Sequence, residues 1–216
     1  MDTADHLGLS AQDLSCRRHD RLLFSGLGLQ VQPGEVLEVC GPNGSGKTTL
    51  LRILCGLRQP DTGAILWQDS SISKDPTIYR GMMCYLGHRQ GMNSDLSPYE
   101  NLRVEADILG LENAQIPKAL VDLGLSSRLQ NLPCRQLSAG QKQRASLARL
   151  LMRKAALWIL DEPIASLDGA AQQLVLQLLA QHVNTGGMVV FTTHQPMQLD
   201  GIAVKQLMLG QGEVPC

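Results

Sequence analysis

The sequence is poor in aromatic residues, which make up 3% of its 216 positions. Proteins that bind single-stranded nucleic acid stack the bases on aromatic side chains, so this scarcity argues against that class. The formal net charge is −1. Without a basic field, nothing draws the chain to the phosphates of nucleic acid or to acidic lipid. We therefore expect no nucleic-acid partner.

The sequence also lacks a long apolar run. A helix that crosses a bilayer needs about 18 apolar residues, and the stretch 147–160, rich in Leu and Ala, is interrupted by Arg149, Arg153 and Lys154. Membrane association is therefore expected only through partner proteins. The six cysteines form no C-x-x-C pair and no metal-ligand spacing. We expect most of them to be small buried hydrophobic residues in a reducing compartment.

What the sequence does contain is a phosphate-binding loop. Residues 41–48 fit the pattern G-x-x-x-x-G-K-[ST], which wraps the phosphates of ATP or GTP. Its glycines let consecutive backbone N–H groups turn inward as an anion-binding nest. Lys47 is expected to reach the β- and γ-phosphates, and the Thr48 hydroxyl to ligate Mg²⁺. The predicted nucleotide-binding residues are Gly41, Pro42, Asn43, Gly44, Ser45, Gly46, Lys47, Thr48 and Thr49.

Strands and helices alternate along the chain. Short strands are predicted between 14 and 39 and at 63–68, and buried strands at 82–86, 156–160 and 188–192. Helices are predicted at 49–56, 98–109, 117–123, 138–152 and 170–182. This alternation favours an α/β fold with a mostly parallel sheet covered on both faces. We expect one domain over 1–216, a P-loop NTPase with a RecA-like core, an N-terminal antiparallel β region and an inserted helical subdomain over 89–152.

A second nucleotide motif follows the buried strand 156–160. This strand runs directly into Asp161 and Glu162, and open α/β sheets place ligand chemistry at the carboxyl ends of their strands. Asp161 is expected to hold Mg²⁺, and Glu162 to polarise the attacking water as a general base. By itself this pattern also fits a strand end with a solvated acidic turn. Together with the phosphate-binding loop it indicates hydrolysis of a nucleoside triphosphate.

Three more stretches give the chain a resemblance to the ATPases of ABC transporters. Residues 137–141, Leu-Ser-Ala-Gly-Gln, followed by Lys-Gln-Arg at 142–144, closely resemble the signature sequence of that family. Residues 165–168, Ala-Ser-Leu-Asp, resemble its D-loop. His194, at the end of a predicted strand, resembles its switch histidine; outside this context ordinary polar packing would be favoured. The motifs match in order and spacing, so the resemblance covers nearly the whole chain.

The resemblance implies ATP and Mg²⁺ as ligands and a homodimer in which two cassettes pack head to tail. In that family the signature loop of one cassette faces the ATP in the phosphate-binding loop of the other. Ser138, Gly140, Gln141 and Asp168 are the ATP contacts that it implies, with Ser138 and Gly140 at a helix N-terminus. It also implies that His194 contacts the γ-phosphate and senses its loss.

The chain departs from the family pattern at three positions. Most members carry a glutamine after the strand that precedes the helical subdomain; His88 falls there, with Gln90 as the alternative. The adenine-stacking aromatic is replaced by Arg18, which either stacks on the base through its guanidinium or is a plain surface residue, so base selectivity stays open. Ala139 stands where glycine is commoner, which is tolerable unless the position requires a positive φ.

These departures, with the stretches 22–24, 67–68, 85–91 and 98–102, resemble one subgroup, the ATP-binding subunits of cytochrome c maturation (haem exporter) complexes in Gram-negative bacteria. That resemblance implies a CcmB-like permease, a haem-handling membrane subunit and a peripheral position on the cytoplasmic face of the bacterial inner membrane. Hydrolysis would drive either haem export or release of a haem-loaded chaperone. No C-x-x-C-H motif is present, and nothing in the sequence indicates a haem site.

We therefore expect an ABC-type ATPase of the haem-transporting kind, with Lys47, Glu162 and His194 as its catalytic residues. One alternative is an ABC transporter subunit for another small substrate. A second, from a different class, is a non-transport ABC ATPase acting on ribosomes or DNA. Those proteins usually join two cassettes or carry long insertions and basic arms, and this sequence shows one cassette without such an arm.

Overall fold

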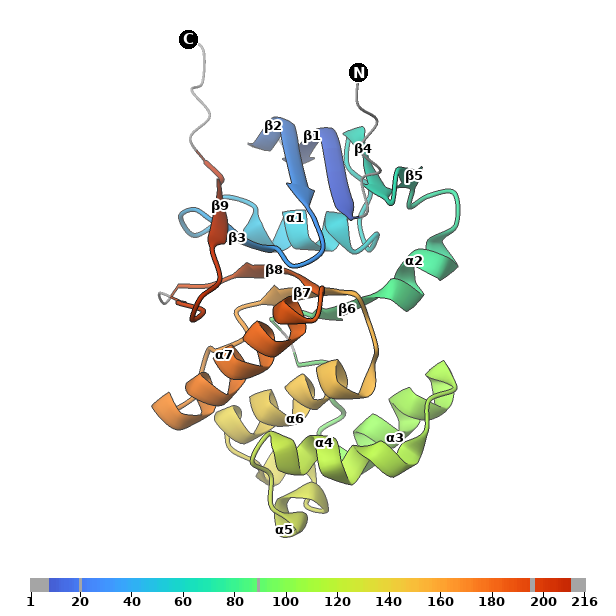
Figure 1. Ribbon diagram of the computed structural model, residues 1–216, viewed down its shortest axis with the longest axis vertical. Coiled ribbons are helices and arrows are strands. Elements are labelled where there is room, and N and C mark those ends of the chain that lie inside the picture. Colours follow the sequence, from blue (N-terminus) through green and yellow to red (C-terminus); the bar gives the residue numbers. More distant parts are fainter. Residues whose placement is uncertain (1–7, 20, 89, 195–196, 211–216) are drawn as a thin grey trace.

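A computed structural model describes residues 8–19, 21–88, 90–194 and 197–210. Two sheets and two groups of helices make up the fold (Figure 1). One sheet is antiparallel and lies at the top of the view, and its strands run in the order β2-β1-β4-β5. Its strands are β1 (Leu9–Arg18), β2 (Arg21–Val31), β4 (Thr62–Trp67) and β5 (Ser70–Ser71).

The second sheet is parallel and has the order β6-β7-β8-β3-β9. Every residue of β7 and β8, two of its three inner strands, is buried. Parallel strands covered on both faces read as continuous apolar runs, which is why the sequence pattern found these two strands. The strands of this sheet are β3 (Val36–Cys40), β6 (Met83–Leu86), β7 (Leu157–Asp161), β8 (Met188–Thr192) and β9 (Val204–Met208).

The helices cover the parallel sheet from both sides. Helix α1 (Lys47–Leu54) lies between the two sheets, and α7 (Gly169–Asn184) and α6 (Ala139–Met152) lie on the opposite face of the parallel sheet (Figure 1). One buried cluster joins α1 to both sheets, and a second joins the parallel sheet to the helices below it. The remaining helices are α2 (Pro76–Met82), α3 (Pro98–Leu109), α4 (Ile116–Asp122) and α5 (Ser127–Gln130), with single 3-10 turns at Asn113–Gln115 and Cys134–Gln136.

Helix α3 shows why residue types at helix ends predicted a helix over this range. Ser97 caps its N-terminus by accepting from the N–H of Glu100, whose carboxylate accepts from the N–H of Ser97 in return. Pro98 stands at the first helical position, and Gly110 ends the helix with a φ of 66°. These are the start and stop signals that favour a helix over this range.

The structure confirms the α/β fold class with its parallel core and antiparallel N-terminal sheet. The predicted strands and helices are present within a few residues of their expected ends, while α2, α5, β5 and β9 were not predicted. The expected first residue of the helical subdomain, residue 89, lies outside the described residues; α3 to α6 follow it. Within the described part of the chain, no helix is both long and apolar enough to span a bilayer.

Candidate active site

The phosphate-binding loop joins β3 to α1 and closes tightly on itself. Gly41, Gly44 and Gly46 have φ values of 143°, 78° and 104°, in the region that favours glycine. A Cβ atom on Gly41 would lie 2.6 Å from the carbonyl oxygen of Leu209, at the end of β9. The buried Lys47 side chain folds back over the loop, and its Nζ donates to the carbonyl oxygens of Gly41 and Pro42 at 2.7 and 3.1 Å. Glycine geometry and the Lys47 hydrogen bonds therefore fix the shape of the loop.

This loop forms one wall of a cleft of about 900 Å³. The opposite walls come from the end of β7, the segment after β8 and the tip of the β1–β2 pair. The cleft thus collects residues that are far apart in the sequence, and most of them belong to the predicted site. Its described lining residues are Arg18, His19, Arg21, Leu23, Asn43, Gly44, Gly46, Lys47, Thr48, Thr49, Asp161, Glu162 and His194.

Asp161 ends β7 with a buried carboxyl group that is 4% exposed. Its Oδ1 accepts from the Thr192 hydroxyl at 2.7 Å. Its Oδ2 is buried and has no hydrogen-bond partner among the described residues. An unpaired buried carboxylate oxygen is costly, and oxygen ligands from a carboxylate and a hydroxyl suit Mg²⁺. Asp161 and Thr48, which line the same cleft, therefore fit a magnesium ion.

Glu162 directly follows Asp161 and is held in an unusual conformation. Its φ is 55°, a left-handed value that costs a non-glycine residue of order 1–3 kcal/mol. Its backbone N–H donates to the carbonyl oxygen of Thr192 at 3.1 Å and lies 3.2 Å from the Thr192 hydroxyl. Its carboxylate Oε1 lies 3.2 Å from Nε2 of His194. The strained backbone thus turns the Glu162 side chain toward the cleft, beside His194.

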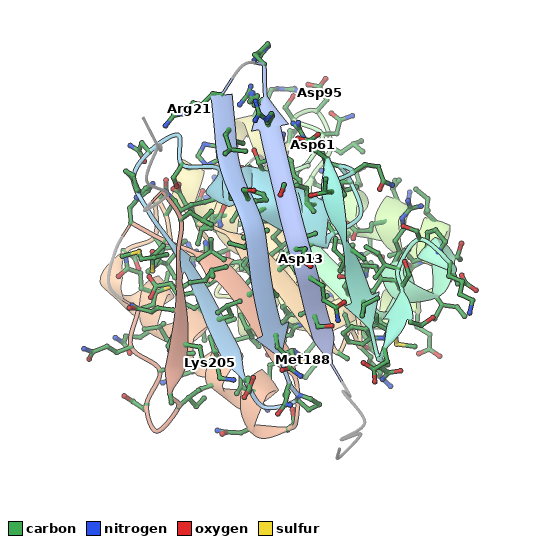
Figure 2. The ribbon with its side chains drawn as sticks, turned by 90° about the horizontal axis from the view of Figure 1, so that it is seen from above. Asp13, Arg21, Asp61, Asp95, Met188 and Lys205 are labelled. Atoms are coloured by element: carbon green, nitrogen blue, oxygen red, sulfur yellow. The ribbon has the colours of Figure 1, made fainter. Side chains whose placement is uncertain are left out.

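The wall of the cleft that the β1–β2 pair provides carries basic side chains. Arg18 ends β1, Arg21 begins β2, and the two residues are register partners. Viewed from above, Arg21 lies at one end of the antiparallel sheet, away from Met188 and Lys205 (Figure 2). Among the described residues that line the cleft, none is Phe, Tyr or Trp. The structure therefore places Arg18 at the cleft, as predicted, without deciding whether it stacks on a base.

The signature and D-loop residues form a different hollow, of about 460 Å³. Ser138 caps α6 and exchanges hydrogen bonds with Gln141, the side chain of each accepting from the backbone N–H of the other. A Cβ atom on Gly140 would lie 2.8 Å from the carbonyl oxygen of Ser166, so glycine lets α6 approach the D-loop closely. Asp168 caps α7, its Oδ1 accepting from the Ala171 N–H at 2.8 Å.

None of the described residues that line this hollow also lines the cleft. A single chain therefore holds the two predicted halves of the ATP site on separate surfaces. Ala139 begins α6 and is not among the residues with a positive φ. The condition under which alanine is tolerated at this signature position is met.

His88 and Gln90 follow β6 and have different surroundings. His88 is exposed and is not among the described residues that line the cleft. Gln90 is half-buried, and its amide Nε2 donates to Oε1 of Gln143 on α6 at 3.3 Å. Gln90 is therefore hydrogen-bonded to helix α6. Which of the two takes the place of the family glutamine stays a prediction.

The cysteines behave as small core residues. Cys16, Cys55, Cys84 and Cys134 are buried, as predicted, and Cys216 lies outside the described residues. Cys40, next to the phosphate-binding loop, is half-buried, and burial, together with the nearby Glu38, raises the pKa of its thiol to about 11. No group of three or more His, Cys, Asp or Glu side chains that could hold a metal ion occurs in the described ranges.

Two positions that matter for the site were not predicted. Thr192 orients Asp161 and binds the Glu162 backbone. Its sequence signal is a threonine at the end of an otherwise apolar strand. Gln143 connects α6 to Pro163 and Gln90. Gln143 lies in the stretch that resembles the family signature, but its contacts were not predicted, because they depend on which loops the fold brings against one helix.

A parallel sheet with a phosphate-binding loop, a carboxylate pair and a strand-end histidine at one cleft defines a P-loop ATPase. A sequence model of the ABC transporter family matches residues 24–165, and the chain belongs to that family. A solved ATP-binding subunit of an ABC transporter superposes with a TM-score of 0.83 at 26% identity, over 94% of this chain and 85% of that one. The dimeric ATP-binding cassette MJ0796, bound to ADP and Pi, superposes with a TM-score of 0.78 at 23% identity, over 87% of this chain and 88% of that one.

Curated relatives assign the chain to a subgroup of this family. The cytochrome c biogenesis ATP-binding export protein CcmA of Nitrosomonas europaea is 47% identical over 203 residues, which cover 93% of this chain and 95% of the relative. CcmA of Methylococcus capsulatus is 46% identical over 195 residues, covering 89% of this chain and 94% of the relative. Within the ABC transporters, the chain therefore falls in the CcmA family.

Proposed function

We propose that the chain hydrolyses ATP as a head-to-tail dimer and thereby powers a membrane complex for cytochrome c maturation. The observation that carries the proposal is the separation of the signature hollow from the cleft within one chain. A second copy, turned head to tail, would bring its Ser138 and Gly140 to the γ-phosphate end of the first copy's cleft. The solved cassette MJ0796 is a dimer bound to ADP and Pi, which supports a dimer of this chain.

Within each cleft, the loop residues position the phosphates. The backbone N–H groups of 43–48 bind phosphate oxygens as a nest, and the N-terminus of α1 adds its partial positive charge. Lys47 exchanges the two loop carbonyls that it now binds for β- and γ-phosphate oxygens. Holding the reacting groups in place is the larger part of catalysis in phosphoryl transfer.

Of the two carboxylates, one binds the metal ion and the other activates the water. Thr48 and Asp161 would hold Mg²⁺, which when bound neutralises the charge that builds up on the phosphate oxygens. Glu162 accepts a proton from the attacking water, and the left-handed backbone at this residue aims the carboxylate into the cleft. His194, beside Glu162, donates to the γ-phosphate and registers its loss. The Thr192 hydroxyl bonds to both the Asp161 carboxylate and the Glu162 backbone, and so fixes the position of one residue relative to the other.

The relatives are export proteins of cytochrome c biogenesis, which supports a proposal of membrane partners. We infer a CcmB-like permease and a haem-handling membrane subunit, with the ATPase dimer bound at the cytoplasmic face of the bacterial inner membrane. The dimer would drive haem export or the release of a haem-loaded chaperone. Co-purification from detergent-solubilised membranes tests this part, since recovery of a permease of another transport system would favour the alternative of a different small substrate.

The composite site is tested by mixing two defective copies. A Lys47→Ala copy has an intact signature, and a Ser138→Arg copy has an intact phosphate-binding loop. A mixed head-to-tail dimer regains one complete site of its two, so a 1:1 mixture should recover roughly a quarter of wild-type turnover. Each variant alone should be inactive. If the mixture is no more active than the separate variants, the site is not shared between copies.

A further inference from the structure

Helix α6 touches the loop between β7 and α7 at two points. Near its start, Gly140 lies so close to Ser166 that only a hydrogen fits at its Cβ position. One turn later, the Gln143 side chain donates from Nε2 to the carbonyl oxygen of Pro163 at 3.0 Å. Pro163 directly follows Glu162. The helix that carries the signature therefore holds the backbone next to the proposed general base.

Gln143 makes a second contact with a different part of the chain. Its Oε1 accepts from Nε2 of Gln90, in the segment that follows β6, at 3.3 Å. A single side chain thus donates to the loop after β7 and accepts from the loop after β6. A flat amide offers a donor and an acceptor in fixed positions. A hydrophobic residue of the same size would fill the space and hold neither loop.

Arg149, further along α6, keeps the segment after β6 in place. Its Nη1 donates to the carbonyl oxygen of Gln90 at 2.7 Å, and its Nη2 to that of Gly91 at 2.8 Å. Its Nε lies 2.6 Å from Oε2 of Glu105 on α3, with both side chains largely buried. The backbone at 90–91 is therefore fixed to two helices without any help from Gln143. What Gln143 adds is the connection from this fixed segment to the loop that carries Glu162.

We propose that Gln143 is a positioning residue for hydrolysis, which holds Pro163 and thereby fixes the backbone that aims Glu162. The inference rests on the proposed role of Glu162 as general base. Gln143 is not among the described residues that line the cleft. Its loss should therefore lower the rate of the chemical step and leave ATP binding almost unchanged, because the phosphate-binding loop does not depend on it.

The test uses the full-length chain with Gln143→Met, which keeps the length of the side chain and removes both hydrogen bonds. We expect kcat for ATP hydrolysis to fall by about tenfold, with KM for ATP within about twofold of wild type. Gln177→Met is the matched control, since Gln177 is an exposed glutamine on α7 and does not line the cleft. It should leave kcat and KM unchanged. Gln143→Glu, which still accepts from Gln90 but does not donate to Pro163, should also lose turnover.

The outcomes separate this inference from the function on which it rests. If Glu162→Gln abolishes turnover while both Gln143 variants keep kcat within twofold of wild type, Gln143 has no positioning role. If Glu162→Gln retains turnover, the proposed general base is wrong, whatever the Gln143 variants do. A fall in kcat that is matched by a rise in KM would also overturn the positioning role, since it would mean that the variant deforms the binding loop. Should Gln143→Met not fold, Gln143→Glu supplies the same comparison.

Discussion

His194 Nε2 lies 3.2 Å from Glu162 Oε1, and the two side chains reach this contact from different strands of the parallel sheet. Glu162 follows β7 and His194 follows β8, and these strands are neighbours in the sheet. The carboxyl ends of adjacent parallel strands lie side by side, so the pairing is a consequence of strand order. The contact places the proposed base and the proposed γ-phosphate sensor in one hydrogen-bonding unit.

The first prediction concerns the base. Glu162→Gln keeps the size and the hydrogen-bonding capacity of the side chain but removes its ability to take a proton. Turnover should fall by a hundredfold or more, on the order of the contribution of general-base catalysis, while ATP affinity is retained. Binding of a fluorescent ATP analogue and phosphate release measure the two quantities. The exposed Glu112→Gln serves as control, and undiminished turnover in Glu162→Gln would remove Glu162 as the base.

The second prediction concerns Thr192. Thr192→Val is nearly isosteric, and it removes the hydroxyl that donates to Asp161 Oδ1 at 2.7 Å. Without this bond the Asp161 carboxylate is less well oriented, so a higher Mg²⁺ concentration should be needed for half-maximal ATPase activity. A magnesium titration of hydrolysis at saturating ATP measures the shift. Thr185→Val, at the exposed end of α7, should leave the titration unchanged; an unshifted curve for Thr192→Val would mean that Thr192 does not support the metal site.

The third prediction concerns the pH dependence of stability. The His182 ring stacks on Trp158 with centroids 3.7 Å apart and planes 2° from parallel. Burial lowers the pKa of His182 in the folded chain below its ordinary value of 6.5. The unfolded state therefore takes up a proton first as the pH falls. Folding stability should decrease as the pH drops below about 6.5, until the folded-state pKa is reached.

Denaturant unfolding of wild type and His182→Phe at pH 7.5 and 5.5 measures this effect. Phenylalanine keeps a flat ring against Trp158 and has no proton to gain, so the variant should lose less stability between the two pH values than wild type does. His88→Phe replaces an exposed histidine and is the matched control. An equal pH-dependent loss in wild type and His182→Phe would show that His182 does not carry the dependence.

The sequence was most informative where local chemistry decides structure. The phosphate-binding loop, the buried strands β7 and β8 and the capped helix α3 follow from residue types and spacing. Helix α2 was missed although Asp75 caps it and Pro76 starts it, because it is only seven residues long and has one buried residue. Strand β9 was missed because its residues are mostly exposed and its pairing with β3 is set by the fold.

The same distinction applies to the site. Lys47, Thr48, Asp161 and Glu162 line one cleft in the structure, and each was singled out because it belongs to a motif with its own chemistry. The separation of Ser138 and Asp168 from that cleft was implied only by the family resemblance. Contacts between distant segments, such as those of Gln143, depend on packing that no local pattern encodes.

The last prediction concerns the base of the nucleotide. Arg18 lines the cleft where the family has an aromatic residue, and a guanidinium stacks on a purine less specifically than a ring does. If Arg18 stacks on the base, Arg18→Ala should weaken ATP binding severalfold, and Arg18→Tyr should restore or exceed wild-type affinity, since aromatic stacking contributes about 1–3 kcal/mol per base. Titrations with ATP and GTP measure both the affinity and the preference between the two bases. Arg17→Ala, one residue away and outside the described cleft lining, is the control. Unchanged affinity in Arg18→Ala would make Arg18 a surface residue and would leave base recognition to other parts of the cleft.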